Sequence, residues 1–340
     1  MKLFKLSISV LILGLIAILL VIFIPRNYDV PAQTFRKGTQ FWNLQTGSKI
    51  AYTLIPSIGN KQAFPIIFLQ GGPGGFISDR NIQILKPLSE DGYDIYLYDQ
   101  IGSGLSERLS NIKDYTTKRH ENDLAEIIET IAAEKVILIG QSWGASLAGL
   151  YLANHPNKVA KLILTGPGPI LPLPNNIQQI LAPDSLNLKK PQFSNKEANE
   201  KVIDLRIKLL TFFAQNFGIK LASDEEMDAF QTYLNGELNK AIVCDTSRAL
   251  QAEAGGGFYA QVMTLKSFNE TQNVRPKING INIPLLLMKG QCDAMPWAYM
   301  KEYMDLFPNH ILRIIPEAGH SISVEQPELY RKYIREFLKE

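Results

Sequence analysis

Short apolar runs recur along the chain, separated by segments of helical length. They cover residues 66–69, 95–98, 136–139 and 162–164, and a predicted hairpin of strands 40–43 and 49–55 precedes them. The runs do not alternate between apolar and polar positions, which is typical of a parallel sheet covered on both faces. A predicted helix follows each of the first three runs, over residues 82–88, 118–133 and 145–154. The pattern therefore predicts an α/β fold with a mostly parallel sheet and helices on both faces.

The strand pattern disappears at Gly166 and resumes after Asn282. Capping signals at residues 194–197 and 223–226 indicate two helices within this segment, which we expect to end at Gly218 and Gly236. A segment of this length is not a structureless loop, so we predict a helical insertion. Strands at 284–288 and 311–315 and helices at 297–306 and 325–338 then complete the sheet.

The resulting division of the chain has a core interrupted by a lid. Residues 39–165 and 283–340 form the predicted core, and residues 166–282 form the predicted helical lid. In open parallel sheets, ligands bind outside the carboxyl ends of the strands, and we expect the lid to cover that edge.

The N-terminus departs from this globular pattern. Residues 6–24 are apolar except for two serines and a glycine, and this length is close to what a membrane-spanning helix requires. A cleaved signal peptide is the alternative, but its apolar region is usually shorter and no small-residue cleavage site follows. We predict a single-pass membrane anchor over residues 1–24 and a linker over 25–38. The flanking charges balance, but a short basic N-terminus favours a catalytic domain outside the cytoplasm.

The composition excludes several classes of function. Lys and Arg number 35 against 33 Asp and Glu, so no positive surplus favours nucleic acid as a partner. No metal-binding spacing of Cys or His residues and no internal repeat is present, so we expect neither a metal nor a cofactor. Cys244 and Cys292 are the two cysteines; free thiols are the simpler interpretation, and the sequence leaves pairing open.

Ser142 has a glycine two residues away on each side, at the junction of the strand 136–139 and the helix that follows. A serine that only caps a helix does not need Gly140 and Gly144 as neighbours. A nucleophile elbow does need them, because the serine lies on a sharp strand-to-helix turn where backbones crowd together. We predict that Ser142 is a nucleophile.

A serine nucleophile needs a base, and the base needs a group that orients it. His320 follows the strand 311–315 in a turn, whereas His310 precedes that strand and the other two histidines lie at helix ends. Asp293 directly follows the strand 284–288. The chain order of serine, acid and histidine matches the order of this fold, so we predict Asp293 and His320 as the other triad members.

Acyl transfer also requires hydrogen-bond donors for the developing oxyanion. The backbone N–H of Trp143 is one donor by position. Gly72 supplies the other from the glycine-rich turn 70–75 that follows strand 66–69. A phosphate-binding loop is the rival interpretation of this turn, but no Gly-Lys-Ser/Thr sequence follows it.

Three motifs together resemble the proline iminopeptidase branch of the α/β-hydrolase superfamily. They are Gly-Gly-Pro-Gly-Gly at 71–75, Asp-Gln-Ile-Gly-Ser-Gly-Leu-Ser at 99–106 and Gly-Gln-Ser-Trp-Gly at 140–144. The resemblance implies an α/β-hydrolase fold and a serine aminopeptidase that removes an N-terminal residue from short peptides without a metal or cofactor. In that family, residues 99–106 look like a structural turn. Gln70 stands where the family usually has histidine, and the lid lacks the family's tryptophan-rich segment.

An aminopeptidase must recognise the free α-ammonium group of its substrate, and a lid carboxylate can do so. The resemblance favours Glu253, which precedes aromatic residues late in the lid, and Glu237 is a weaker second candidate. A carboxylesterase or lipase acting on a small ester is the first alternative, because the same triad opens esters. A catalytically inactive binding protein is the second, although no triad member is missing.

Overall fold

The computed structural model describes residue 14 and residues 21–174 and 180–340. The described residues form a mixed sheet of eight strands in the order β1-β2-β4-β3-β5-β6-β7-β8. β1 pairs antiparallel with β2, and β2 pairs antiparallel with β4. The remaining neighbours in this order are parallel. The strands are β1 (Gln40–Asn43), β2 (Lys49–Ile55), β3 (Ile66–Leu69), β4 (Ile95–Tyr98), β5 (Val136–Gln141), β6 (Val159–Thr165), β7 (Leu285–Gly290) and β8 (His310–Ile315). The predicted fold class is confirmed.

The unalternating strands arise because both faces of the sheet are covered. In β5, Leu138 belongs to the apolar core on one face, and its neighbours Ile137 and Ile139 belong to the core on the other face. One core contains side chains of α4 (Thr117–Ile131), α5 (Trp143–Asn154) and α11 (Trp297–Leu306). The other contains side chains of α2 (Asp79–Leu85), α3 (Pro87–Glu90) and α13 (Pro327–Lys339).

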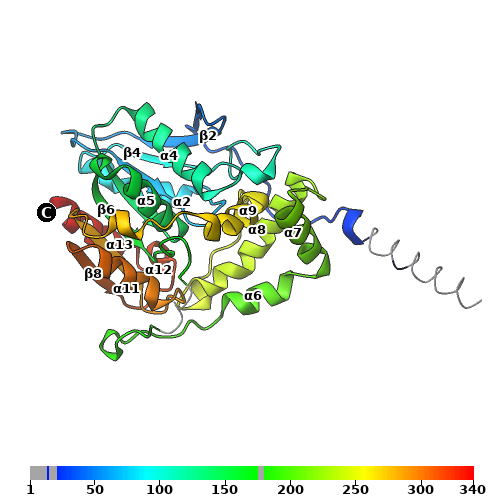
Figure 1. Ribbon diagram of the computed structural model, residues 1–340. Coiled ribbons are helices and arrows are strands. Elements are labelled where there is room, and N and C mark those ends of the chain that lie inside the picture. Colours follow the sequence, from blue (N-terminus) through cyan, green and yellow to red (C-terminus); the bar gives the residue numbers. More distant parts are fainter. Residues whose placement is uncertain (1–13, 15–20, 175–179) are drawn as a thin grey trace, which may run out of the picture.

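The segment between β6 and β7 is helical, and its main helices lie to one side of the sheet (Figure 1). They are α6 (Asn195–Val202), α7 (Leu205–Phe217), α8 (Asp224–Ala241) and α9 (Phe258–Lys266). The short helix α10 (Arg275–Ile278) packs against α5 instead. Ser194 forms the predicted capping box, and Gly218 ends α7 with a φ of 70°.

Two predicted boundaries within this segment are wrong. The helix that begins after Ser194 breaks at Ile203, because Asp204 caps a new helix by accepting a hydrogen bond from Ile207 N. The second helix does not end at Gly236 but continues to Ala241. Gly236 lies inside the helix, where a Cβ atom would make an ordinary contact with Ala252 at 3.4 Å.

The structure requires a correction at the N-terminus. Residues 1–13 and 15–20 hold most of the predicted anchor 1–24 and lie outside the described residues. Within the described part of the chain, no helix is long and apolar enough to cross a membrane. At the end of the apolar run, Ile22 packs on protein: it is 5% exposed, and its carbonyl accepts a hydrogen bond from Arg206 Nε of α7 at 3.2 Å. Its neighbours Val21, Phe23 and Ile24 are exposed. Neither the single-pass anchor nor the extracytoplasmic placement that follows from it is therefore supported.

The two cysteines form a disulfide, which corrects the interpretation as free thiols. Cys244 follows α8 and Cys292 follows β7, and their Cα atoms are 5.2 Å apart. The pairing was not evident from the sequence because 48 positions separate the two residues. The fold brings them together by returning the end of α8 to the carboxyl end of β7.

Candidate active site

Ser142 lies at the sharp turn between β5 and α5. Its backbone has a φ of 54° and a ψ of −119°, which is a strained conformation for a residue with a side chain. The predicted crowding is present on both sides. A Cβ atom on Gly140 would lie 2.7 Å from Gly144 O, and one on Gly144 would lie 2.0 Å from Leu69 O. The flanking glycines therefore allow the strained turn that presents the serine hydroxyl.

Asp293 and His320 meet at the carboxyl ends of β7 and β8. His320 Nδ1 donates a hydrogen bond to Asp293 Oδ1 at 3.0 Å, and the N–H of Met295 donates to the same oxygen at 2.9 Å. The side chain of Asp293 is fully buried. Burial on its own raises the pKa of Asp293, but His320 and, to a smaller extent, Lys289 and Met295 lower it to about 2. The carboxylate is therefore ionised at neutral pH and can orient the imidazole.

The three predicted triad residues line one cavity of about 750 Å³. Ser142 is partly exposed to it, and within the described chain its hydroxyl makes no hydrogen bond. Catalytic hydrogen bonds are often loose in a free enzyme and tighten when substrate binds. The other histidines face elsewhere. His120 is buried, and its ring bonds Thr264 Oγ1 at 3.0 Å. Burial lowers its pKa to about 4, so His120 is a buried, neutral side chain and not a helix cap.

The two predicted oxyanion donors also border this cavity. Trp143 is the first residue of α5, so its N–H has no acceptor within the helix. Gly72 has a φ of 123°, which a residue with a side chain rarely adopts. A Cβ atom on the neighbouring Gly71 would lie 3.2 Å from Ser142 Cβ, so this loop passes directly beside the serine.

Two glutamine side chains hold the glycine-rich loop 70–75 in place; because it carries the predicted donor Gly72, we call it the oxyanion loop. Gln70 Nε2 donates to Phe76 O at 3.0 Å, and Gln70 Oε1 accepts from Gly71 N at 3.0 Å. Gln100 Nε2 donates to Gln70 O at 2.8 Å, and its Oε1 accepts from Gly74 N at 3.0 Å. Gln70, which stands where the resembling family has histidine, thus has a structural role here.

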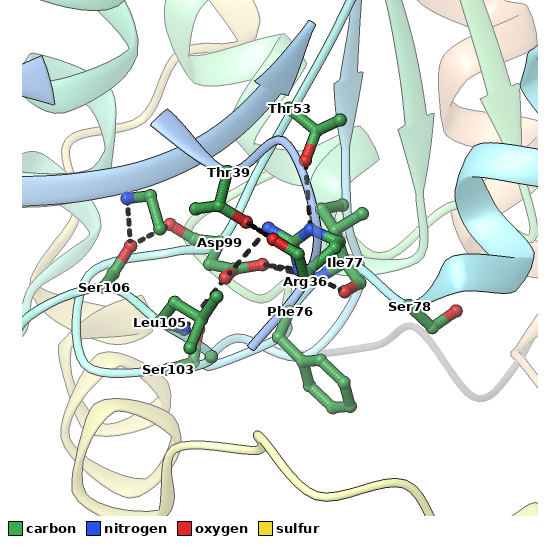
Figure 2. A network of polar contacts seen from close by, with 12 residues as sticks. Arg36, Thr39, Thr53, Phe76, Ile77, Ser78, Asp99, Ser103, Leu105 and Ser106 are labelled. Atoms are coloured by element: carbon green, nitrogen blue, oxygen red, sulfur yellow. Dashed lines mark hydrogen bonds and ion pairs between the residues drawn. The ribbon is translucent and has the colours of Figure 1, made fainter. Parts of the chain in front are cut away.

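Sequence reasoning missed Arg36, which reaches the same loop from the predicted linker (Figure 2). Its guanidinium lies 3.2 Å from the fully buried Asp99 carboxylate, donates to Ile77 O at 2.6 Å and bonds Thr53 Oγ1 at 3.0 Å. Asp99 also accepts hydrogen bonds from Ile77 N at 2.7 Å and Leu105 N at 2.9 Å. Asp99 therefore ties the end of the oxyanion loop to the turn 99–106. No local motif marks Arg36, so its role depends on a contact across the fold.

The two candidate substrate-binding carboxylates are placed differently. Glu253 lines the cavity, where partial desolvation raises its pKa. Glu237 forms ion pairs with Lys201 at 3.1 Å and Lys240 at 2.8 Å and does not line the cavity. The structure thus brings Glu253, but not Glu237, into the wall of the site.

The lid wall contains several amides that the sequence did not mark. Gln231 of α8 is 3% exposed, and its Nε2 donates to Asn235 Oδ1 at 2.9 Å. Its Oε1 has no hydrogen-bond partner in the described chain. Together with Asn239 and Gln261, these side chains add neutral polar groups to a wall that also contains apolar side chains such as Leu238 and Phe268. Among the described residues, no group of three or more His, Cys, Asp or Glu side chains is arranged to hold a metal ion.

The chain belongs to the α/β hydrolase fold family, which matches residues 65–327. The proline iminopeptidase of Heyndrickxia coagulans is 24% identical over 302 residues, which cover 86% of this chain and 96% of that protein. A putative 2-succinyl-6-hydroxy-2,4-cyclohexadiene-1-carboxylate synthase of Bacillus subtilis is 28% identical over 242 residues, covering 71% of this chain and 79% of that protein. The predicted family resemblance is confirmed, and the protein is a hydrolase of the α/β fold.

Solved structures agree on the fold. An esterase from Exiguobacterium antarcticum has a TM-score of 0.57 at 20% identity, covering 88% of this chain and 99% of that one. A thermophilic esterase from Thermogutta terrifontis has a TM-score of 0.59 at 18% identity, covering 88% and 98%. At these identities the similarity concerns the fold and not the substrate.

Proposed function

We propose that this protein is a serine hydrolase that releases the N-terminal residue of short peptides through an acyl-enzyme. The observation that carries the proposal is the His320–Asp293 hydrogen bond beside a strained Ser142, all opening into one cavity. This combination of nucleophile, base and orienting acid is the one that acyl transfer requires.

The proposed reaction has two steps. Ser142 Oγ attacks the carbonyl carbon of the substrate while its proton passes to His320 Nε2, and Asp293 holds the opposite ring nitrogen. The N–H groups of Trp143 and Gly72 donate hydrogen bonds to the oxyanion of the tetrahedral intermediate and stabilise its negative charge. His320 then protonates the leaving amine, and a water molecule repeats the sequence to release the acid and restore Ser142.

Two observations support an aminopeptidase. Full-length relatives include proline iminopeptidases, and Glu253 lines the same cavity as Ser142, where its carboxylate could bind a substrate's ammonium group. A charge-assisted hydrogen bond to that carboxylate favours a free amino terminus over a blocked one.

Covalent labelling tests the nucleophile. A fluorophosphonate probe should label the wild type and fail to label Ser142→Ala, while circular dichroism shows the variant to be folded. Labelling that persists in Ser142→Ala would reject the assignment. A wild type that is not labelled would favour the inactive binding protein.

Paired substrates test the specificity. Proline naphthylamide should be cleaved and its N-acetyl form should not, and Glu253→Gln should lower kcat/KM for the free amine by about tenfold. Glu237→Gln is the matched control and should leave kcat/KM unchanged, since this carboxylate is paired with lysines outside the cavity. Equal activity on the free and acetylated substrates would favour the esterase alternative.

A further inference from the structure

A buried lysine contacts the proposed catalytic acid from the side opposite the histidine. Lys289 is in β7, every residue of which is buried, and it is itself 2% exposed. Lysine is almost never fully buried without a partner. Its ammonium group donates to Met295 O at 2.8 Å and Asp293 O at 3.2 Å, and lies 3.3 Å from Asp293 Oδ2. All three oxygens belong to the loop that carries the acid.

The two oxygens of the Asp293 carboxylate therefore face different cations. Oδ1 faces His320 Nδ1 at 3.0 Å, and Oδ2 faces Lys289 Nζ. The contact at Oδ2 is an ion pair without hydrogen-bond geometry, and Oδ2 has no other polar partner in the described chain. The influence of Lys289 on this oxygen is thus mainly electrostatic.

We propose that Lys289 is a positioning residue of the triad, which fixes the loop of Asp293 and limits how strongly that carboxylate favours a protonated His320. The proposal rests on the proposed serine hydrolase function. His320 must be neutral in the free enzyme to accept the proton of Ser142. The full charge of a buried carboxylate would hold a proton on the imidazole up to a higher pH, and a cation against the same carboxylate opposes this effect.

The charged groups on neighbouring elements are engaged elsewhere. Arg313 of β8 is exposed and lies over the Tyr333 ring. Glu302 of α11 pairs with Arg275, and Glu325 accepts hydrogen bonds from Gly319 N and Cys244 N. Lys161 of β6 donates to Phe337 O and Leu338 O. Lys301 and Asp305 of α11 form an exposed ion pair, and His310 of β8 bonds Phe307 O. Within the described chain, Lys289 and His320 are thus the ionisable groups in contact with the Asp293 carboxylate.

Substitution of Lys289 should move the acid side of the pH–rate profile. Without the positive charge of Lys289, the Asp293 carboxylate should favour a protonated imidazole more strongly. The acid limb should therefore shift upward by about one pH unit. A lysine that only holds the loop would lower the rate at every pH without moving this limb.

The test measures the rate of fluorophosphonate labelling from pH 5 to 9 in Lys289→Met and Lys289→Gln. Glutamine keeps N–H donors for the carbonyl groups and removes only the charge, so it serves if the methionine variant does not fold. Lys161→Met is the matched control, because this lysine also donates to two backbone carbonyls but at the opposite end of the neighbouring strand.

We expect the acid limb to rise by about one pH unit in the folded Lys289 variants and to stay unchanged in Lys161→Met. An acid limb that is unchanged or lowered in folded Lys289→Gln would overturn the proposal. Labelling that does not depend on Ser142 would instead reject the proposed function, so the two failures are distinguishable.

Discussion

Replacing Gly144 with alanine is expected to damage both stability and catalysis. A Cβ atom at this position would lie 2.0 Å from Leu69 O and 2.6 Å from Leu69 C, both in the backbone of β3. Since Cβ atoms are essentially never closer than 3.0 Å to such atoms, α5 and β3 must separate by about 1 Å. Overpacking of this kind costs about 3 kcal/mol of unfolding free energy. The same displacement moves Ser142 relative to the oxyanion loop after Leu69, and a misplacement of about 1 Å can lower kcat about 100-fold.

Gly149→Ala is the matched control within the same helix. The nearest atom to its added Cβ would be Tyr303 Oη at 3.8 Å, which is an ordinary contact. Alanine in a helix interior is more favourable than glycine, so this variant should be up to about 1 kcal/mol more stable than the wild type. Urea unfolding and the rate of fluorophosphonate labelling measure the two effects. If Gly144→Ala were as stable and as reactive as Gly149→Ala, the crowding explanation of the elbow would be refuted.

Two further predictions concern groups outside the triad. Arg36→Gln should lower the unfolding free energy by about 3 kcal/mol because it leaves Asp99 buried without its cation. Asp99→Asn should cost less in this background than in the wild type, because the charge that it removes is already unpaired; purely additive losses in urea unfolding would contradict this coupling. His120 has a folded pKa of about 4, below the unfolded value of about 6.5, so the stability it contributes is fully present above pH 6.5 and is lost as the pH falls toward 4. His120→Gln should therefore reduce the slope of unfolding free energy against pH in this window by up to about 1.4 kcal/mol per unit, and an unchanged slope would show that His120 is not the group responsible.

Strands were predictable from the sequence where the pattern was continuous. The predicted bounds of β1 to β4 agree with the structure, because turn residues or polar residues delimit each run. The lid was harder, since helix ends there depend on tertiary contacts. Gly236 is an example: a glycine often marks a helix end, but here α8 continues through it to Ala241.

The candidate site likewise combines residues that local sequence signals reveal with residues that only tertiary contacts reveal. Residues proposed to do chemistry, such as Ser142, Asp293 and His320, stand at strand ends in an order that the sequence displays. Residues that hold them in place are not marked by position or order in the sequence. Arg36 contacts Asp99 across 63 positions, and a lysine inside an apolar strand such as β7 has no signature of its role until the fold places Asp293 beside it.

The helical insertion is bonded to the loops that carry Asp293 and His320, the proposed acid and base. The Cys244–Cys292 disulfide joins the end of the lid helix α8 to the residue before Asp293. Glu325 joins the same lid segment to the histidine loop, since its carboxylate accepts hydrogen bonds from Cys244 N at 2.8 Å and Gly319 N at 2.6 Å. These two links connect the end of α8 to the loop of Asp293 and to the loop of His320, so a shift of this segment would act on both proposed triad residues. The segment of Glu253 is bonded to α8 itself, since Asn239 donates to Leu250 O at 3.0 Å, and the described contacts link it to neither loop directly. We therefore expect substitutions around Glu253 to change substrate preference more than the Asp293–His320 hydrogen bond.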